Sequence, residues 1–184
     1  MKVFINPGHS PGGVPDPGAV GVGGIRECDV ALSVGKMVKG YLEAVGIATE
    51  LLQSNSLNGE DEDADNPSIC GRANASGAEL FISIHCNSFN TRARGTECCV
   101  FSTTGKASQL AWCIQRQITD SLGTADRGLK ERRDLAVLKH TTMSAVLVEL
   151  AFIDNEADCR LLEAKQDDLA RAIARGVTDY LGGN

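Results

Sequence analysis

The chain has 184 residues, of which 42% are hydrophobic and 23% charged, and it carries a formal net charge of −6. Its length suffices for one domain with a complete core, and its composition is that of an ordinary globular protein. The negative charge and the lack of a basic stripe argue against nucleic acid as a partner. No apolar run approaches the roughly 20 residues of a membrane span. The start of the chain turns polar too early for a signal peptide.

Short extended segments alternate with helical segments from the start of the chain. Residues 2–6 are predicted to form a strand, and a long Gly- and Pro-rich loop follows at 7–24, a kind of loop that is usually functional in a compact domain. A helix should begin at Glu27, because apolar residues then recur every three or four positions, and Gly46 is suited to end it. Residues 47–52 are the next predicted strand.

The middle of the chain begins with a polar segment at 54–66 that contains an acidic run at 60–65. Its spacing does not fit an EF-hand, so a solvated loop is expected. Asn66 and Pro67 suit the cap and the first position of a short helix. The elements predicted after it are strands at 78–87 and 95–103 and a helix at 106–122.

The last part of the chain contains a predicted loop at 126–138 and then a nearly continuous apolar run at 145–153, typical of a strand buried on both faces. Two helices are predicted to follow, at 155–163 and 165–181. The alternation of strands and helices predicts a single α/β domain over residues 1–184. Its central sheet should be mostly parallel, with about six strands and helices on both faces.

Three reactive side chains fall at the ends of predicted strands. His9 follows the first strand, His85 lies near the end of the strand at 78–87, and Glu149 lies late in the apolar run at 145–153. Ligand sites in open α/β sheets form at the carboxyl ends of the strands. A single histidine there is more often a packing residue than a ligand. Glu149 is a stronger candidate, because an unpaired buried carboxylate costs roughly several kcal/mol and should therefore be paired, protonated or near a metal.

Two histidines and a glutamate form a recognised catalytic zinc set that leaves one coordination position open. The chain has no HExxH motif, so the ligands would have to come from separate segments. Glu27 is the best candidate for the carboxylate, because it follows the loop that starts near His9. An acidic residue also favours a helix amino terminus through the helix dipole, so this position has a structural explanation as well.

The remaining reactive residues have simpler interpretations. His140 lies in a polar segment and is expected to face solvent or the substrate, without binding a metal. The seven cysteines form no CxxC pair, which predicts reduced and mostly buried thiols. Cys86 should face away from His85, because adjacent strand residues point to opposite faces. The basic cluster of Lys130, Arg132 and Arg133 fits a solvated turn as well as it fits an anion-binding site.

Several short motifs occur in a characteristic order. They are Asn6-Pro7-Gly8-His9, Glu27 at the start of a helix, Ser83-Ile84-His85-Cys86-Asn87, Gly95-Thr96-Glu97, and Val148-Glu149-Leu150-Ala151-Phe152-Ile153-Asp154-Asn155. In this order and spacing the chain resembles the zinc-dependent N-acetylmuramoyl-L-alanine amidases, the family of AmiC-like catalytic domains. The resemblance extends from the first predicted strand to the last predicted helix.

The resemblance implies one zinc ion on His9, Glu27 and His85, with Glu149 as the catalytic glutamate and Asn87 contacting the substrate. The implied substrate is the amide between N-acetylmuramic acid and L-alanine in peptidoglycan. The chain would then be a monomeric catalytic domain without a separate cell-wall-binding domain. It would act on the wall, outside the cell or in the periplasm, as a phage lysin or as a domain of a larger protein.

Other functions use some of the same residues. A zinc peptidase that cuts the stem peptide would have the same metal ligands. A catalytically silent wall-binding module would not need His9, Glu27, His85 and Glu149 together. A cysteine enzyme fits least well, because no cysteine lies in an evident pairing with histidine.

Overall fold

The computed structural model describes residues 1–57 and 67–183. Within these residues one six-stranded sheet is formed by β1 (Lys2–Pro7), β2 (Ala48–Leu51), β3 (Leu80–Asn87), β4 (Thr96–Val100), β5 (Asp126–Glu131) and β6 (Ser144–Phe152). The strand order is β2-β1-β3-β6-β4-β5. Neighbouring strands are parallel except β4 and β6, which are antiparallel. The carboxyl ends of β3 and β6 therefore lie at the same edge as the start of β4.

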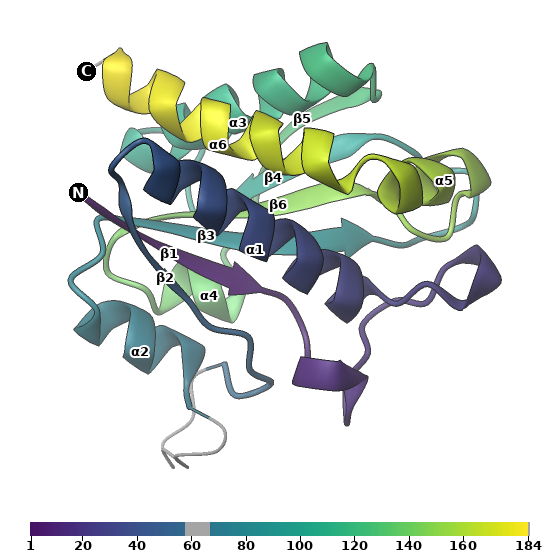
Figure 1. The fold of residues 1–184 in the computed structure, drawn as a ribbon, viewed down its shortest axis with the longest axis horizontal. Coiled ribbons are helices and arrows are strands. Elements are labelled where there is room, and N and C mark those ends of the chain that lie inside the picture. Colours follow the sequence, from purple (N-terminus) through teal and green to yellow (C-terminus); the bar gives the residue numbers. More distant parts are fainter. Residues whose placement is uncertain (58–66, 184) are drawn as a thin grey trace.

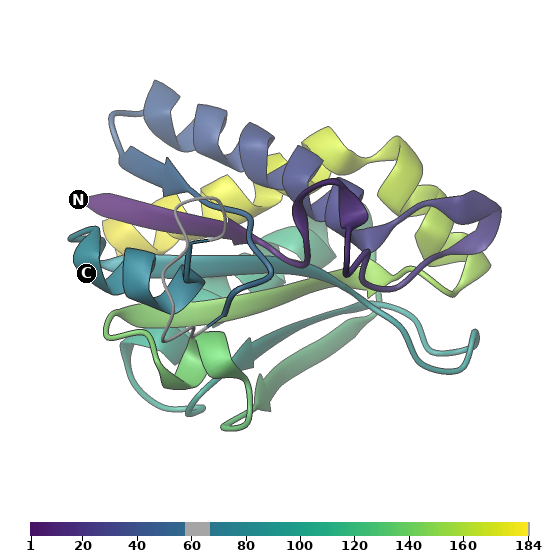
Figure 2. The same cartoon turned by 90° about the horizontal axis from the view of Figure 1, so that it is seen from below.

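Helices cover the two faces of the sheet unequally (Figures 1 and 2). The long helices α1 (Glu27–Ala44), α3 (Lys106–Leu122) and α6 (Gln166–Gly182) pack on one face. The short helices α2 (Ile69–Ala75) and α4 (Ala136–Lys139) pack on the other face, and α5 (Glu156–Ala164) follows β6. Two turns of 3-10 helix, at Pro11–Gly13 and Val22–Gly24, lie in the loop between β1 and α1.

The alternation of side chains along β3 decides which residues share a face. Ile82 and Ile84 belong to the large core beneath α1, α3 and α6, whereas Phe81 belongs to the smaller core beneath α2 and α4. Successive strand residues point to opposite faces. His85 therefore lies on the Phe81 face, and Cys86 packs in the large core, as predicted.

The α/β class, the mostly parallel sheet and the helices on both faces are confirmed. The predicted loop at 126–138 is wrong, because its first part is the edge strand β5 and its apolar end is α4, which buries Val137 and Leu138. Edge strands pair on one side only and tolerate charged residues, so β5 lacks the apolar pattern of a central strand.

The predicted start of the short helix is also wrong. The helix begins at Ile69, because the Ser68 side chain accepts a hydrogen bond from the amide of Gly71 and so caps it. Asn66 and the acidic run at 60–65 lie outside the described residues. All seven cysteines are free, and all but Cys113 are buried, as predicted. In the described part of the chain, no helix is long and apolar enough to cross a bilayer.

Candidate metal centre and its surroundings

The structure brings His9, Glu27 and His85 into one cluster at the carboxyl edge of the sheet. Their potential ligand atoms all lie within 4.8 Å of one another. A carboxylate oxygen of Glu27 lies 2.9 Å from Nε2 of His9 and 2.9 Å from Nδ1 of His85. The two imidazole rings meet edge to face, with centroids 5.0 Å apart.

Glu27 is fixed from several sides although it begins a helix. Its Oε1 accepts a hydrogen bond from the amide of Cys86, and its Oε2 accepts one from the amide of Ala19. The residue is buried, which alone would raise its pKa. Hydrogen bonds with His85 and then His9 outweigh this effect and hold the pKa of the carboxyl well below its usual range. Glu27 is therefore an ionised carboxylate aimed at both histidines.

His9 is held in place by a second carboxylate. Its Nδ1 lies 2.7 Å from Oδ2 of Asp16, and Oδ1 of Asp16 accepts a hydrogen bond from the amide of Gly18. Burial lowers the pKa of His9, but hydrogen bonds with Glu27 and Asp16 raise it to about 9. A carboxylate on the outer nitrogen of a metal-binding histidine is a common arrangement, because it fixes the ring and its tautomer.

Two glycines permit this close packing. A Cβ on Gly8 would lie 2.2 Å from Cε1 of His85. A Cβ on Gly18 would lie 2.6 Å from Oε2 of Glu27 and 2.6 Å from Cδ2 of His9. Gly18 also has a φ of 69°, which side chains rarely adopt. The Gly-rich loop can therefore approach the cluster only without side chains at these positions.

Glu149 lies beside the cluster on the same face of the sheet. It is the register partner of His85 on the neighbouring strand. Its Oε2 is buried and has no hydrogen-bond partner. Burial is the main cause that raises the pKa of Glu149 to about 7, and the charges of Glu27 and Glu97 add to it while His85 opposes it. A carboxyl group with such a pKa can both take up and release a proton near neutral pH.

A polar chain extends from the cluster across the sheet. Glu97 is the register partner of Glu149 on β4. One oxygen of Glu97 accepts a hydrogen bond of 3.0 Å from the side chain of Asn87, and the other accepts one of 2.7 Å from Nε of Arg127. The Asn87 side-chain oxygen in turn accepts the amide of Ser88. Both polar atoms of the Asn87 side chain thus already have partners within the protein.

The other residues singled out in the sequence lie away from this cluster. His140 is exposed at the end of α4, and its carbonyl accepts a hydrogen bond from Asn74. In the basic cluster, Arg132 pairs with Asp134 and Arg133 with Glu131.

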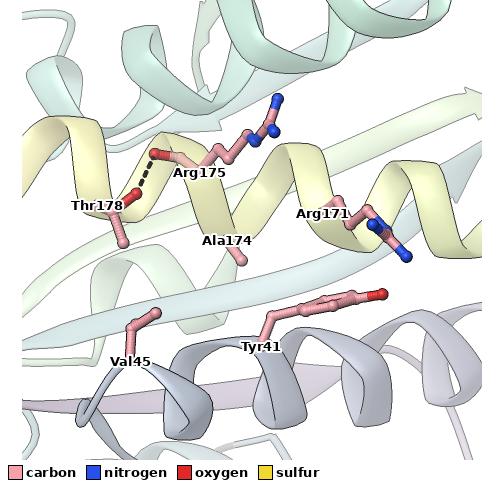
Figure 3. Close-up of a pocket in the computed structure, with 6 residues that line it drawn as sticks. All are labelled: Tyr41, Val45, Arg171, Ala174, Arg175 and Thr178. Carbon is pink, nitrogen blue, oxygen red and sulfur yellow. Dashed lines mark hydrogen bonds between the residues drawn. The ribbon is translucent and has the colours of Figure 1, made fainter.

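A pocket between α1 and α6 lies on the opposite face of the sheet (Figure 3). It is lined by Tyr41, Val45, Arg171, Ala174, Arg175 and Thr178. None of these side chains is a typical metal ligand or an activated nucleophile. This pocket therefore offers no counterpart to the chemistry of the His9, Glu27 and His85 cluster.

A sequence profile described as N-acetylmuramoyl-L-alanine amidase matches residues 3–179. The chain belongs to this amidase family. It is 35% identical to the N-acetylmuramoyl-L-alanine amidase LytC of Bacillus subtilis (strain 168) and covers 35% of that protein, matching with 97% of its own length. It is 32% identical to the endolysin of Bacillus phage SPP1 and covers 65% of it, again with 97% of its own length. The chain thus spans about one third to two thirds of these two relatives.

A solved structure in the amidase family has the same fold. The N-acetylmuramoyl-L-alanine amidase AmiC2 of Nostoc punctiforme superposes with a TM-score of 0.83 at 29% identity, over 99% of this chain and 97% of that chain. The donor set of two imidazole nitrogens and one carboxylate fits a divalent ion such as zinc. Asp16 lies on the outer nitrogen of His9, and Glu149 lies on the strand next to His85.

Three residues around the cluster were not among the site residues predicted from the sequence. Asp16 lies seven positions after His9 in the Gly-rich loop, and its acidic character there was the available signal. Glu97 lies in the Gly95-Thr96-Glu97 motif, but its partners come from β3 and β5. Arg127 lies in a segment predicted as a loop, so nothing in the sequence connected it with this site.

Proposed function

We propose that this chain is a zinc-dependent amidase that hydrolyses the bond between N-acetylmuramic acid and L-alanine in bacterial peptidoglycan. The observation that carries the proposal is the group of His9, Glu27 and His85, whose ligand atoms lie within 4.8 Å of one another, with Glu149 beside it. Membership of the amidase family supports the choice of substrate. The names of LytC and of the phage endolysin support a role in wall degradation.

His9, Glu27 and His85 would hold one zinc ion in this proposal. When bound, such an ion supplies Lewis acidity and lowers the pKa of a water molecule. Glu149 would accept a proton as water attacks the amide carbon and would return it to the departing nitrogen of L-alanine. Its buried Oε2, which has no partner in the protein, is the atom suited to accept that proton.

The proposal extends to organisation and location. Residues 1–184 would be one catalytic domain, acting as a monomer on the wall, outside the cell or in the periplasm. Asn87 would contribute to the substrate site. Since both of its side-chain polar atoms have partners, we expect it to shape the site through Glu97 and the loop after β3.

Replacement of Glu149 tests the proton-transfer role. Glu149→Gln should reduce amide cleavage by a factor of about 100 to 10,000, because the amide cannot accept the proton. Zinc content, measured by elemental analysis, should stay at the wild-type level. Glu131→Gln changes an exposed carboxylate of β5 and should retain activity. Full turnover by the Glu149→Gln protein would refute the role of Glu149.

Digestion of purified peptidoglycan tests the reaction itself. Mass spectrometry should find free lactyl ends on muramic acid and peptides that begin with L-alanine. A chelator should abolish these products, and added zinc should restore them. A zinc peptidase acting on the stem peptide would instead release D-amino acids or peptide fragments while the muramoyl amide stays intact. Cleavage that persists after complete removal of metal would contradict zinc dependence.

A further inference from the structure

Strand β5 contains a bulge opposite Glu97. Thr96 pairs with Asp126 and Cys98 pairs with Leu129, so Arg127 and Gly128 together face the single residue between them on β4. Gly128 has a φ of 70°, and Oδ1 of Asp126 accepts hydrogen bonds from its amide and from the Gln115 side chain. Bulges at sheet edges often redirect a side chain next to an active site.

The bulge directs Arg127 over the face that carries Glu149. Its Nε donates to Glu97 at 2.7 Å, and its Cζ lies 4.8 Å from the centre of the Phe152 ring. The side chain is nevertheless 37% exposed. Among the described residues, its guanidinium makes no other hydrogen bond, so the donors of its two terminal nitrogens have no protein partner there. This geometry is suited to a planar anion, because a guanidinium fork matches a carboxylate with two parallel hydrogen bonds.

The position of Arg127 relative to the proposed chemistry is set by the sheet. His85, Glu149 and Glu97 are register partners on three adjacent strands. Adjacent strands lie about 4.8 Å apart, and an extended peptide advances about 3.3 to 3.6 Å per residue. The guanidinium beside Glu97 is therefore about two residues away from an amide bound over Glu149.

We propose that Arg127 binds the free carboxylate of the peptide residue that follows L-alanine in the substrate. This inference rests on the proposed amidase function. The sugars of the glycan offer hydroxyl and acetamido groups, and the muramoyl carboxyl is engaged in the scissile amide. Carboxylates are therefore found on the peptide side of that bond. In this arrangement the stem peptide lies on the β4 and β5 side of the site. Arg127 then makes the enzyme selective for a peptide that carries this carboxylate.

The alternative is that Arg127 only neutralises Glu97. Glu97 already has both oxygens bonded, to Asn87 and Arg127. A purely structural arginine would affect every substrate equally when it is replaced. A carboxylate-binding arginine would affect substrates according to whether they carry the charge, and this difference separates the two roles.

Two synthetic N-acetylmuramoyl-dipeptides provide the test. They differ only at the second residue, which carries a free carboxylate in one dipeptide and a primary amide in its place in the other. The wild type should prefer the acid in kcat/KM on the order of tenfold or more, as expected for a charge-assisted hydrogen bond. Arg127→Gln should bring the ratio close to one. Arg127→Lys should keep part of it, because the ammonium retains the charge but not the fork.

Arg133→Gln is the matched control. Arg133 also pairs through Nε with one glutamate, Glu131, and lies 5.7 Å from an aromatic ring, that of Phe101. This variant should keep the wild-type preference. The same ratios should appear in the dissociation constants of both dipeptides for the Glu149→Gln protein, measured by calorimetry without turnover.

The outcomes are distinct. A wild type that cleaves both dipeptides equally well, or an Arg127→Gln protein that loses activity on both in equal proportion, would overturn the carboxylate-binding role. A wild type that cleaves neither dipeptide and does not release peptide from the wall would refute the proposed amidase function, and this inference with it.

Discussion

At the scale of single residues, each ring nitrogen of His9 has its own carboxylate partner. His9 faces Glu27 with Nε2 and Asp16 with Nδ1. In the neutral ring that would bind a metal, the acceptor Asp16 favours the tautomer in which Nδ1 carries the proton and Nε2 keeps its lone pair. The orientation of this candidate ligand therefore depends on a residue that would not touch the metal.

Removal of Asp16 should weaken metal binding. Asp16→Ala deletes the partner of Nδ1, and we expect a 10- to 100-fold loss in zinc affinity, the usual effect of losing such an outer carboxylate. Competition with a chromophoric chelator measures this affinity. Asp29→Ala removes another exposed carboxylate from the same region, one that is bonded to Arg26, and should bind zinc as the wild type does. Equal affinities for both variants would show that Asp16 does not orient His9.

The sequence predicted the three members of the cluster and the neighbouring Glu149 for different reasons. His9, His85 and Glu149 follow from their positions at strand ends, and Glu27 came mainly from the family resemblance. Arg127 could not be predicted, because its partner Glu97 is 30 positions away and belongs to another strand. Pairings of this kind depend on strand order and register, which hydrophobic periodicity does not specify.

At the scale of elements, the loop between β1 and α1 is more ordered than its composition suggests. The amide of Glu27 donates to the carbonyl of Ala19, and the amide of Cys28 donates to that of Pro17. The amide of Ser10 donates to the carbonyl of Asp16. These bonds fold the loop back on itself, so that Gly18 lies against Glu27 in the first turn of α1.

Two glycines of this loop provide a matched comparison. Gly18 and Gly12 have nearly the same φ, 69° and 67°, but a Cβ at Gly12 would meet nothing within 4 Å. Both alanine variants should therefore bear a similar backbone strain of about 1 kcal/mol. Gly18→Ala alone should displace Glu27 or His9 and lower zinc affinity by tenfold or more. Comparable zinc affinities in calorimetric titrations of the two variants would contradict the steric argument.

The elements themselves were mostly predictable where periodicity is strong. The long helices and the buried strands match their apolar patterns, as in α1 with Val30, Val34 and Val38. Strand β5 was missed because its sequence, with four charged residues among six, resembles a loop. Its place at the edge of the sheet is a property of the whole arrangement and explains why such a sequence can be a strand.

At the scale of the whole molecule, the two faces of the sheet differ, because the larger core and the ionisable residues of the site lie on opposite faces. The face under α1, α3 and α6 holds the larger apolar core, whereas the other face holds the smaller core and the row of His85, Glu149 and Glu97. Burial of ionisable groups in this row lowers the free energy of unfolding by an amount that depends on pH.

The metal-free protein should lose stability as pH rises because of Glu149. Its folded-state pKa is about 7, above the ordinary value of 4.5. Below about pH 4.5 the group is protonated in both states and costs nothing. Between the two values only the unfolded chain releases the proton, which lowers the free energy of unfolding by up to about 3 kcal/mol by pH 8.

Urea denaturation of the metal-free wild type and its Glu149→Gln variant, measured from pH 5 to pH 8, checks this expectation. The variant should become increasingly more stable than the wild type as pH rises, because glutamine does not ionise. Glu131→Gln, a change on the exposed edge strand, should show no such trend. A stability difference between wild type and Glu149→Gln that does not vary with pH would contradict the raised pKa.

The central position of β6 affects how the site is assembled. Strands β3 and β4 follow one another in the chain, yet β6, the last described strand, lies between them in the sheet. Joining segments so distant in sequence costs chain entropy before their contacts compensate for it. His85 and Glu97 can therefore flank Glu149 only once β6 has docked. The proposed hydrolytic site should thus form in the final stage of folding, and partly folded chains should be inactive.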